Sequence, residues 1–235
     1  MNLGMRVAGI LALNLLTACS HAPTSGVQLL SRAIDAAGGE AALRNAGRLI
    51  WDGEADVHAG GRDIHLGVRS DIAPLGHVRS ETWLREQGPS SMRILELDGR
   101  HGWITRDGKR EILDQKIAEN EYAQYGTYGL MLLVSLRDPA VETVLVGKDA
   151  DGLQGLRVNH PILPQATLWF DADARLKALT NTVSSAEGGP PLRQRFEFKG
   201  SVHSNGVNWP QQISISQDDK PFFELRIAGF EIKAK

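Results

Sequence analysis

The segment from Ile117 to Leu136 constrains the fold more than any other part of the chain. It contains no proline and no alternation of polar with apolar residues, and it is too long for one strand. Its second half, Tyr128 to Leu136, is apolar on nearly every side, and a helix of that kind has to be buried. We therefore predict one helix here, or two short helices separated near Gly126–Gly129, enclosed by the rest of the protein.

The flanking sequence predicts an antiparallel sheet, because turn signals recur roughly every 8–12 residues. Asp98-Gly99 and Asp107-Gly108 predict tight hairpins, since Asp-Gly tolerates the positive φ that such turns require. We expect about eleven strands in a curved sheet. The apolar concave face of that sheet needs a cover, and only the central helix is both apolar and long enough to supply it.

A second helix is predicted at the start of the domain. Apolar residues recur with a helical period from Val27 to Ala37, and Gly38-Gly39 then ends the helix. The stretch from Glu40 to Asn45 can add a short further turn of helix. The fold class predicted from the residues is thus α+β, with an N-terminal helix, a central helix and a curved antiparallel sheet.

The N-terminus predicts a secreted, lipid-anchored protein. A single charge at Arg6, a short apolar run and small residues before Cys19 are typical of a secretory signal and too short for a membrane span. Leu16-Thr17-Ala18-Cys19 resembles the bacterial lipobox, which implies a signal peptide over residues 1–18 and acylation of Cys19. An ordinary signal peptide with a chance cysteine is the alternative. Residues 19–26 would form a lipidated tether.

The remaining chain, residues 27–235, has a length that one all-β domain often reaches. A net charge of −2 argues against nucleic acid as a partner, because phosphate binding favours a basic surface. In bacterial lipoproteins, which the N-terminus resembles, an aspartate after the lipidated cysteine favours inner-membrane retention. By that resemblance, Ser20 implies attachment to the periplasmic face of the outer membrane. We expect the domain to be a monomer.

Motifs for chemistry are scarce. The seven histidines show no ligand spacing, and zinc requires three or four converging ligands. The sequence contains no nucleophile elbow and no phosphate-binding loop. We therefore predict no metal, no cofactor and no enzymatic activity.

Aromatic and apolar residues on the predicted strands and central helix are candidates for lining a hydrophobic cavity that accepts acyl chains. Ordinary core packing is the alternative explanation for the same residues. Flexible, polarizable methionine suits an adaptable apolar surface. The candidates are Trp51, Trp83, Trp103, Tyr128, Met131, Leu132, Trp169 and Phe223.

The order of elements and the closing sequence resemble the LolA/LolB lipoprotein-carrier superfamily. Trp209-Pro210, followed by Ile213 and Ile215, and the alternating run from Phe223 to Lys233 are similar to the end of LolB-type receptors. Pro74-Leu75-Gly76 is similar to their Asn-Pro-Leu-Gly loop, although Ala73 replaces the asparagine.

The resemblance covers most of residues 27–233 and implies an incomplete β-barrel lidded by helices around a hydrophobic cavity. It also implies that Leu75 is an exposed leucine that aids lipid transfer; a turn residue folded back onto the sheet is the alternative. The implied function is a membrane-anchored carrier or receptor that holds the acyl chains of a lipoprotein or another envelope lipid. A non-carrier envelope protein for interaction or stress sensing is the second hypothesis.

Overall fold

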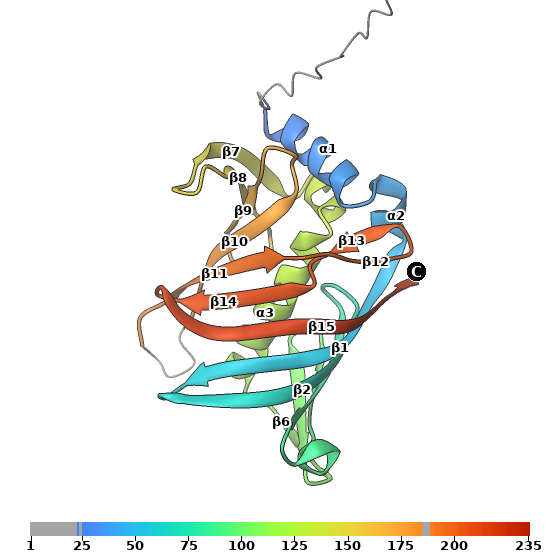
Figure 1. Ribbon diagram of the computed structural model, residues 1–235, viewed down its shortest axis with the longest axis vertical. Helices are drawn as coiled ribbons and strands as arrows, with labels where there is room; N and C mark the ends of the chain where they lie inside the picture. Colours follow the sequence, from blue (N-terminus) through green and yellow to red (C-terminus); the bar gives the residue numbers. More distant parts are fainter. Residues whose placement is uncertain (1–22, 24, 185–188) are drawn as a thin grey trace, which may run out of the picture.

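A long antiparallel sheet curls around a single central helix in the computed structural model, which describes residues 23, 25–184 and 189–235 (Figure 1). Thirteen strands form this sheet and two more form a separate hairpin. The α-helices are α1 (Gly26–Ala36), α2 (Glu40–Asn45) and α3 (Gln115–Met131), with 3-10 turns η1 (Gly88–Ser91) and η2 (Val134–Arg137). The first strands are β1 (Ala46–Ala59), β2 (Arg62–Ile72), β3 (His77–Leu84), β4 (Arg93–Asp98), β5 (His101–Arg106) and β6 (Lys109–Ile112). After α3 follow β7 (Glu142–Lys148), β8 (Gln154–Asn159), β9 (Ala166–Phe170), β10 (Leu176–Val183), β11 (Leu192–Lys199), β12 (Val202–Ser204), β13 (Val207–Trp209), β14 (Gln212–Gln217) and β15 (Lys220–Ala234).

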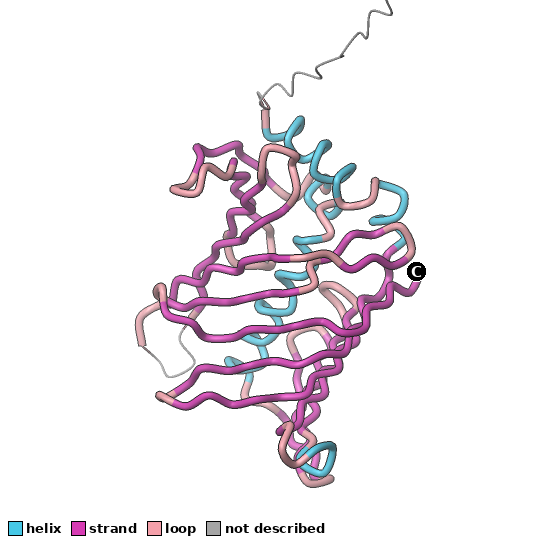
Figure 2. Tube along the Cα trace, viewed as in Figure 1, coloured by secondary structure: helices cyan, strands magenta, loops and turns pink. Residues whose placement is uncertain are grey.

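The two halves of the chain each supply one side of the sheet. The strand order is β6-β5-β4-β3-β2-β1-β15-β14-β11-β10-β9-β8-β7, so the first and last strands of the domain pair in the middle. The helix α3 leaves the edge strand β6, runs through the concave side and leads to the opposite edge strand β7 (Figures 1 and 2). Because these edge strands do not pair with each other, the barrel is incomplete, as the resemblance implied.

The predicted number of strands was too low. Fifteen strands are described instead of about eleven, and the difference includes the short hairpin of β12 and β13. Asn205 and Gly206 form its turn with φ values of 47° and 83°. An Asn-Gly pair between apolar residues is a strong hairpin signal, which the reading of the sequence overlooked.

The central helix is continuous through the glycines, so the single-helix alternative is the observed one. Asp114 caps its first turn, where the carboxylate accepts hydrogen bonds from the backbone N–H groups of Lys116 and Ile117. The helix ends earlier than predicted, at Met131, because Leu133 adopts a left-handed φ of 63° and turns the chain into η2.

The N-terminal helix and the short helix after it lie where the sequence predicted them. Figure 1 shows α1 across the upper end of the curled sheet, above α3. Gly38, which separates α1 from α2, has a φ of 126°, and a Cβ there would lie 1.9 Å from the carbonyl oxygen of Gly206. Only glycine allows this approach, so the turn fixes α1 against the β12–β13 hairpin.

The signal peptide, Cys19 and most of the tether lie outside the described residues. Within the part of the chain that the structure describes, no helix is long and apolar enough to cross a bilayer.

Candidate binding cavity

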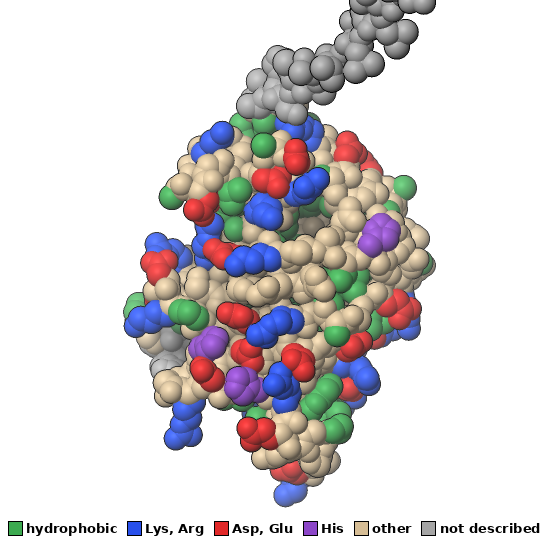
Figure 3. All heavy atoms as spheres, in the orientation of Figure 1, with side chains coloured by type: hydrophobic (Ala, Val, Ile, Leu, Met, Phe, Trp, Pro, Cys, Tyr) green, Lys and Arg blue, Asp and Glu red, His purple; other side chains and the backbone are tan. Residues whose placement is uncertain are grey.

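A cavity of about 390 Å³ lies where α1, the end of α3, the start of β10, the end of β11 and the β12–β13 hairpin meet. This volume is at the lower end of the range for small-molecule sites, roughly 300–1,000 Å³. Figure 3 shows a hollow on the surface between α1 and the β10–β11 part of the sheet, with basic side chains near its edge. The lining residues are Ala33, Ala36, Ala37, Met131, Leu133, Arg175, Leu176, Lys177, Phe198, Gly200, Ser201, Asn208, Trp209 and Pro210.

The roof of the cavity is the last part of α1. Leu29, Leu30, Ala33 and Ile34 form its buried stripe, which holds the helix on the core. The lining residues at its end are alanines, whose small side chains leave space beneath the helix. Asn208 holds this end in place: its backbone N–H donates to the carbonyl of Ala37 at 2.9 Å and its side-chain amide to that of Ala36 at 3.1 Å.

Aromatic rings form the wall beside the hairpin. The indole of Trp209 stacks on Phe230 with centroids 5.9 Å apart, and it also contacts Tyr128 at 6.4 Å. Tyr128 in turn meets Trp51. The Nε1–H of Trp209 is buried and has no hydrogen-bond acceptor among the described residues. A buried donor without an acceptor in the protein is costly, and this donor lies at the cavity wall.

A second hollow of about 470 Å³ lies on another side of the α3–η2 junction. Met131 and Leu133 line the first cavity, whereas Leu132 and Val134 line the second. The junction between α3 and η2 therefore contributes alternate residues to two separate spaces.

Leu75 lies at the second hollow and does not project as an exposed tip. It is half-buried, and its backbone carbonyl accepts a hydrogen bond from the hydroxyl of Tyr122 at 3.1 Å. A Cβ at Gly129 would be 3.4 Å from Leu75 Cγ, so the glycine lets the turn pack closely on α3. Of the two alternatives for this turn, the structure adopts the one folded back onto the domain.

The candidate lining residues separate into three groups. Met131 lines the first cavity and Leu132 the second. Trp51, Tyr128 and Phe223 belong to the core or pack against it, without lining either space. The other three candidates, Trp83, Trp103 and Trp169, require a correction, because their side chains lie on the outer face of the sheet.

These outer tryptophans have structural roles. On β3, β5 and β9 the alternate, buried positions face the core, which places the three indoles on the opposite face. Trp83 covers Gly67, and Trp169 covers Gly155 while donating from Nε1 to the Thr180 hydroxyl at 3.0 Å. The guanidinium of Arg110 lies 4.7 Å from the ring centre of Trp103.

Among the described residues, the titratable groups whose pKa values are shifted lie outside the lining of the cavity. Burial raises the pKa of Tyr125 to about 12, and burial likewise raises the pKa of Tyr128. Burial also raises the pKa of Glu121, against the opposing effect of Arg93. Among the residues that the structure describes, no group of three or more His, Cys, Asp or Glu side chains could hold a metal ion.

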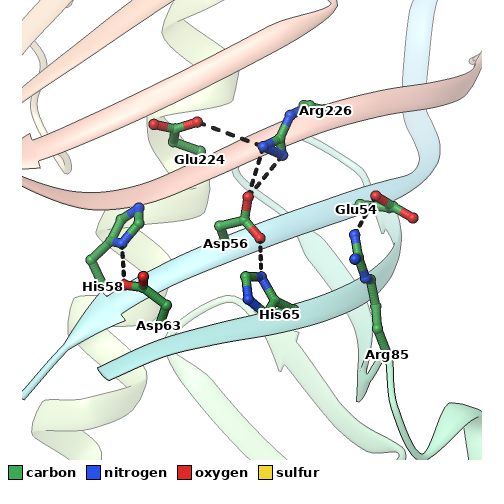
Figure 4. Close-up of polar contacts among 8 residues, drawn as sticks. All are labelled: Glu54, Asp56, His58, Asp63, His65, Arg85, Glu224 and Arg226. Carbon is green, nitrogen blue, oxygen red and sulfur yellow. Dashed lines mark hydrogen bonds and ion pairs between the residues drawn. The ribbon is translucent and has the colours of Figure 1, made fainter. Parts of the chain in front are cut away.

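A polar network lies on the outer face of the sheet, across β1, β2 and β15 (Figure 4). Asp56 accepts two hydrogen bonds from Arg226 and pairs with Nδ1 of His65 at 2.6 Å. His58 pairs in the same way with Asp63 at 2.7 Å. His58 and His65 stand directly opposite their partners in the sheet, so the network is a ladder of cross-strand pairs. It faces away from the cavity.

No family model and no curated protein sequence matches the chain. Solved structures match its fold. A DUF1329 family protein from Desulfovibrio piger aligns over 88% of this chain and 91% of that chain, with a TM-score of 0.57 and 9% identity. A LolA superfamily protein from Nitrosomonas europaea aligns over 90% and 94%, with a TM-score of 0.54 and 10% identity. The chain has a LolA-like fold.

A third structure of similar shape, described as a domain of an outer membrane lipoprotein-sorting protein from Vibrio parahaemolyticus, covers 88% of this chain and 93% of its own. Its TM-score is 0.55 at 9% identity. The predicted resemblance to the LolA/LolB superfamily is confirmed at the level of the fold, and a shared fold does not by itself determine the function.

Sequence reasoning missed most of the lining of the cavity under α1. Ala33 and Ala37 belong to the apolar pattern that predicted the helix, whereas Ala36 does not, so only part of this lining was foreseeable from the pattern. Neither Arg175 nor Lys177 belongs to a recognisable sequence motif. They reach the cavity only because β10 begins there, and nothing in their local sequence indicates it.

Proposed function

We propose that the protein is a non-enzymatic, membrane-anchored lipid-binding protein of the bacterial envelope, which holds an acyl chain of a lipoprotein or another envelope lipid. The observation that supports this most directly is the cavity under α1, where Met131, Phe198 and Trp209 supply apolar lining. Each methylene that a chain buries there contributes about 0.8 kcal/mol, so even part of an acyl chain binds usefully without a charged contact.

The proposed anchor is Cys19, acylated after removal of residues 1–18. A tether of only a few residues, from Cys19 to the start of α1 at Gly26, would keep the cavity close to the bilayer. This arrangement favours a receptor or membrane-proximal acceptor over a shuttle that crosses the periplasm.

The anchor is tested by metabolic labelling with a clickable palmitate analogue and membrane fractionation. We expect label on the native chain and none on Cys19→Ser. Label that persists on Cys19→Ser would contradict acylation at this residue.

Lipid binding is tested on the chain with Cys19→Ser, so that no attached lipid can occupy the cavity. The measurements are native mass spectrometry for co-purified lipid and displacement of a dansyl-labelled fatty acid. Ala36 lines the cavity, and Ala36→Trp places an indole in it. Ala41→Trp, at an exposed position of α2, is the matched control.

We expect Ala36→Trp to weaken fatty-acid binding by at least about tenfold, since it removes the space for several methylenes. Ala41→Trp should bind like the parent chain, and both variants should keep the thermal midpoint within a few degrees. If the parent chain carries no lipid and binds no probe, the carrier proposal is wrong. An interaction protein with the same fold then becomes the better hypothesis.

A further inference from the structure

The charged residues that line the cavity under α1 are both basic. Arg175 and Lys177 are on its wall, and no acidic residue is among its described lining residues. The rest of the wall is apolar or small, apart from Ser201 and Asn208. A space with an apolar wall and two cations has the chemistry to recognise an amphiphile whose polar head is an anion.

Lys177 reaches this position through an irregularity in the sheet. The register of β9 and β10 shifts between Leu176, opposite Phe170, and Ala178, opposite Trp169. Lys177 is therefore the extra residue of a β-bulge, and its place in the ladder has no partner on β9. Bulges bend a strand and re-aim a side chain, and they are frequent beside functional sites.

The ammonium of Lys177 has no anionic partner among the residues that the structure describes. Its residue is half-buried, and no hydrogen bond or ion pair within the described part of the chain engages it. A cation at the cavity wall with no anionic partner from the protein is available to pair with an anion that a ligand brings.

Arg175 is the second cation and is only loosely held. It is exposed, and its guanidinium lies 3.6 Å from the carboxylate of Asp173 in the same turn. The other acid of the turn, Asp171, uses Oδ1 to accept the backbone N–H groups of Asp173 and Arg175. Asp171 therefore maintains the shape of the turn, and Arg175 is free to exchange an exposed pair for a ligand.

We propose that the cavity selects amphiphiles with an anionic head, a carboxylate or a phosphate. The apolar chain of the amphiphile lies under α1 against Met131 and Phe198, and the head contacts Lys177 and Arg175. This inference rests on the proposed function, because it names the class of lipid that the same cavity takes.

The test compares three ligands with the same decyl chain on the Cys19→Ser protein by isothermal titration calorimetry. The ligands are decanoate, decyl phosphate and decanol, each below its aggregation concentration. The variants are Lys177→Gln, Lys177→Arg and Arg175→Gln. Lys109→Gln, an exposed lysine on the edge strand β6, is the matched control.

We expect the parent chain to bind at least one of the two anions about tenfold more tightly than decanol. Lys177→Gln should abolish that preference while leaving the affinity for decanol unchanged, and Lys177→Arg should retain it. Arg175→Gln should reduce the preference by a smaller factor, and Lys109→Gln should have no effect. The relative affinity for decanoate and decyl phosphate then identifies the head group.

Equal affinity of the parent chain for the anions and decanol overturns selection for an anionic head, while the lipid-binding proposal stands. A preference that survives Lys177→Gln overturns the assignment to this residue. Binding of none of the three ligands contradicts the proposed function itself. The comparison of the three ligands on the parent chain tests the preference for anions without any variant. The inference can therefore be overturned even if a variant fails to fold.

Discussion

The phenol ring of Tyr128 meets the indole of Trp51 edge to face, with centroids 5.2 Å apart and ring planes at 70°. Tyr128 comes from the second half of α3 and Trp51 from β1, the strand that joins the two halves of the sheet. Both residues are almost fully buried. Aromatic pairs favour this geometry because the positive edge of one ring faces the negative face of the other. The pair thus attaches the central helix to the middle of the sheet.

Removing the ring of Tyr128 should destabilise the whole domain. We expect Tyr128→Ala to lower the free energy of unfolding by about 3–5 kcal/mol, because it leaves a large cavity between helix and sheet. Tyr128→Phe keeps the ring and should remain within about 1 kcal/mol of the parent chain. Urea unfolding followed by tryptophan fluorescence measures both values. Equal losses in the two variants would show that ring packing is not what matters at this position.

Gly126, in the middle of α3, should be needed because the side chain of Leu163 packs against it, and not because of the helix conformation. A Cβ at Gly126 would lie 2.4 Å from a Cδ of Leu163, a buried residue between β8 and β9. We expect Gly126→Ala to destabilise the fold, although alanine alone favours a helix by about 1 kcal/mol over glycine.

The matched test is the double variant Gly126→Ala with Leu163→Ala. The new methyl group would occupy part of the space left by the leucine, so the two losses should be less than additive by about 1 kcal/mol or more. Additive losses, measured by the same urea unfolding, would contradict direct contact between these positions.

The ladder of cross-strand pairs on β1, β2 and β15 should add stability that depends on pH. The hydrogen bond from His65 holds the pKa of Asp56 below its usual value, with Arg226 acting in the same direction. A carboxyl whose pKa is lower in the folded state stabilises the fold above its unfolded pKa, near 4, and loses that contribution as pH falls through the folded value.

We expect Asp56→Asn to cost at most about 1 kcal/mol at pH 7, since its arginine and histidine partners are half-exposed. The cost should be smaller at pH 3 than at pH 7, because the contribution declines as pH falls below the unfolded pKa, near 4. Asp107→Asn, at an exposed hairpin turn, is the control and should show no such pH dependence. A cost that is the same at both pH values would show that charge is not the cause.

The carboxyl of Glu121 should change the pH dependence of stability in the opposite direction to that of Asp56. Because burial raises the pKa of Glu121 in the folded state, the unfolded chain loses this proton first, and stability falls as pH rises above about 4.3. We expect Glu121→Gln to raise the free energy of unfolding at pH 7 and to have little effect at pH 4. Glu119→Gln, exposed on the same helix, is the control for lost charge. A gain from Glu121→Gln that is equally large at pH 4 would contradict this explanation.

Local patterns predicted the helices well because each depends on nearby residues. Gly38-Gly39 marked the end of α1, and the 115–131 helix was recognised from its lack of alternation. Its last residues were misassigned because Leu132 to Leu136 are helix-compatible in sequence. The reversal at Leu133 is decided by the packing around it.

The faces of the strands were harder to assign. Trp83 and Trp169 are large and apolar, so hydrophobicity alone placed them inside. Their neighbours across the sheet are Gly67 and Gly155, which offer flat surfaces for an indole on the outer face. That pairing depends on strand register, which connects residues far apart in the chain.

By itself the sequence determined the class of fold: a curved antiparallel sheet, an N-terminal helix and a buried central helix, each specified by local periodicity and turn residues. Only the tertiary structure decided where the cavity lies and what lines it. Ala36, Lys177 and Trp209 come from three distant segments, and they converge because the sheet curls until α1 and the β12–β13 hairpin meet. Such convergence depends on register, a bulge and helix docking, none of which is encoded within a short window of sequence.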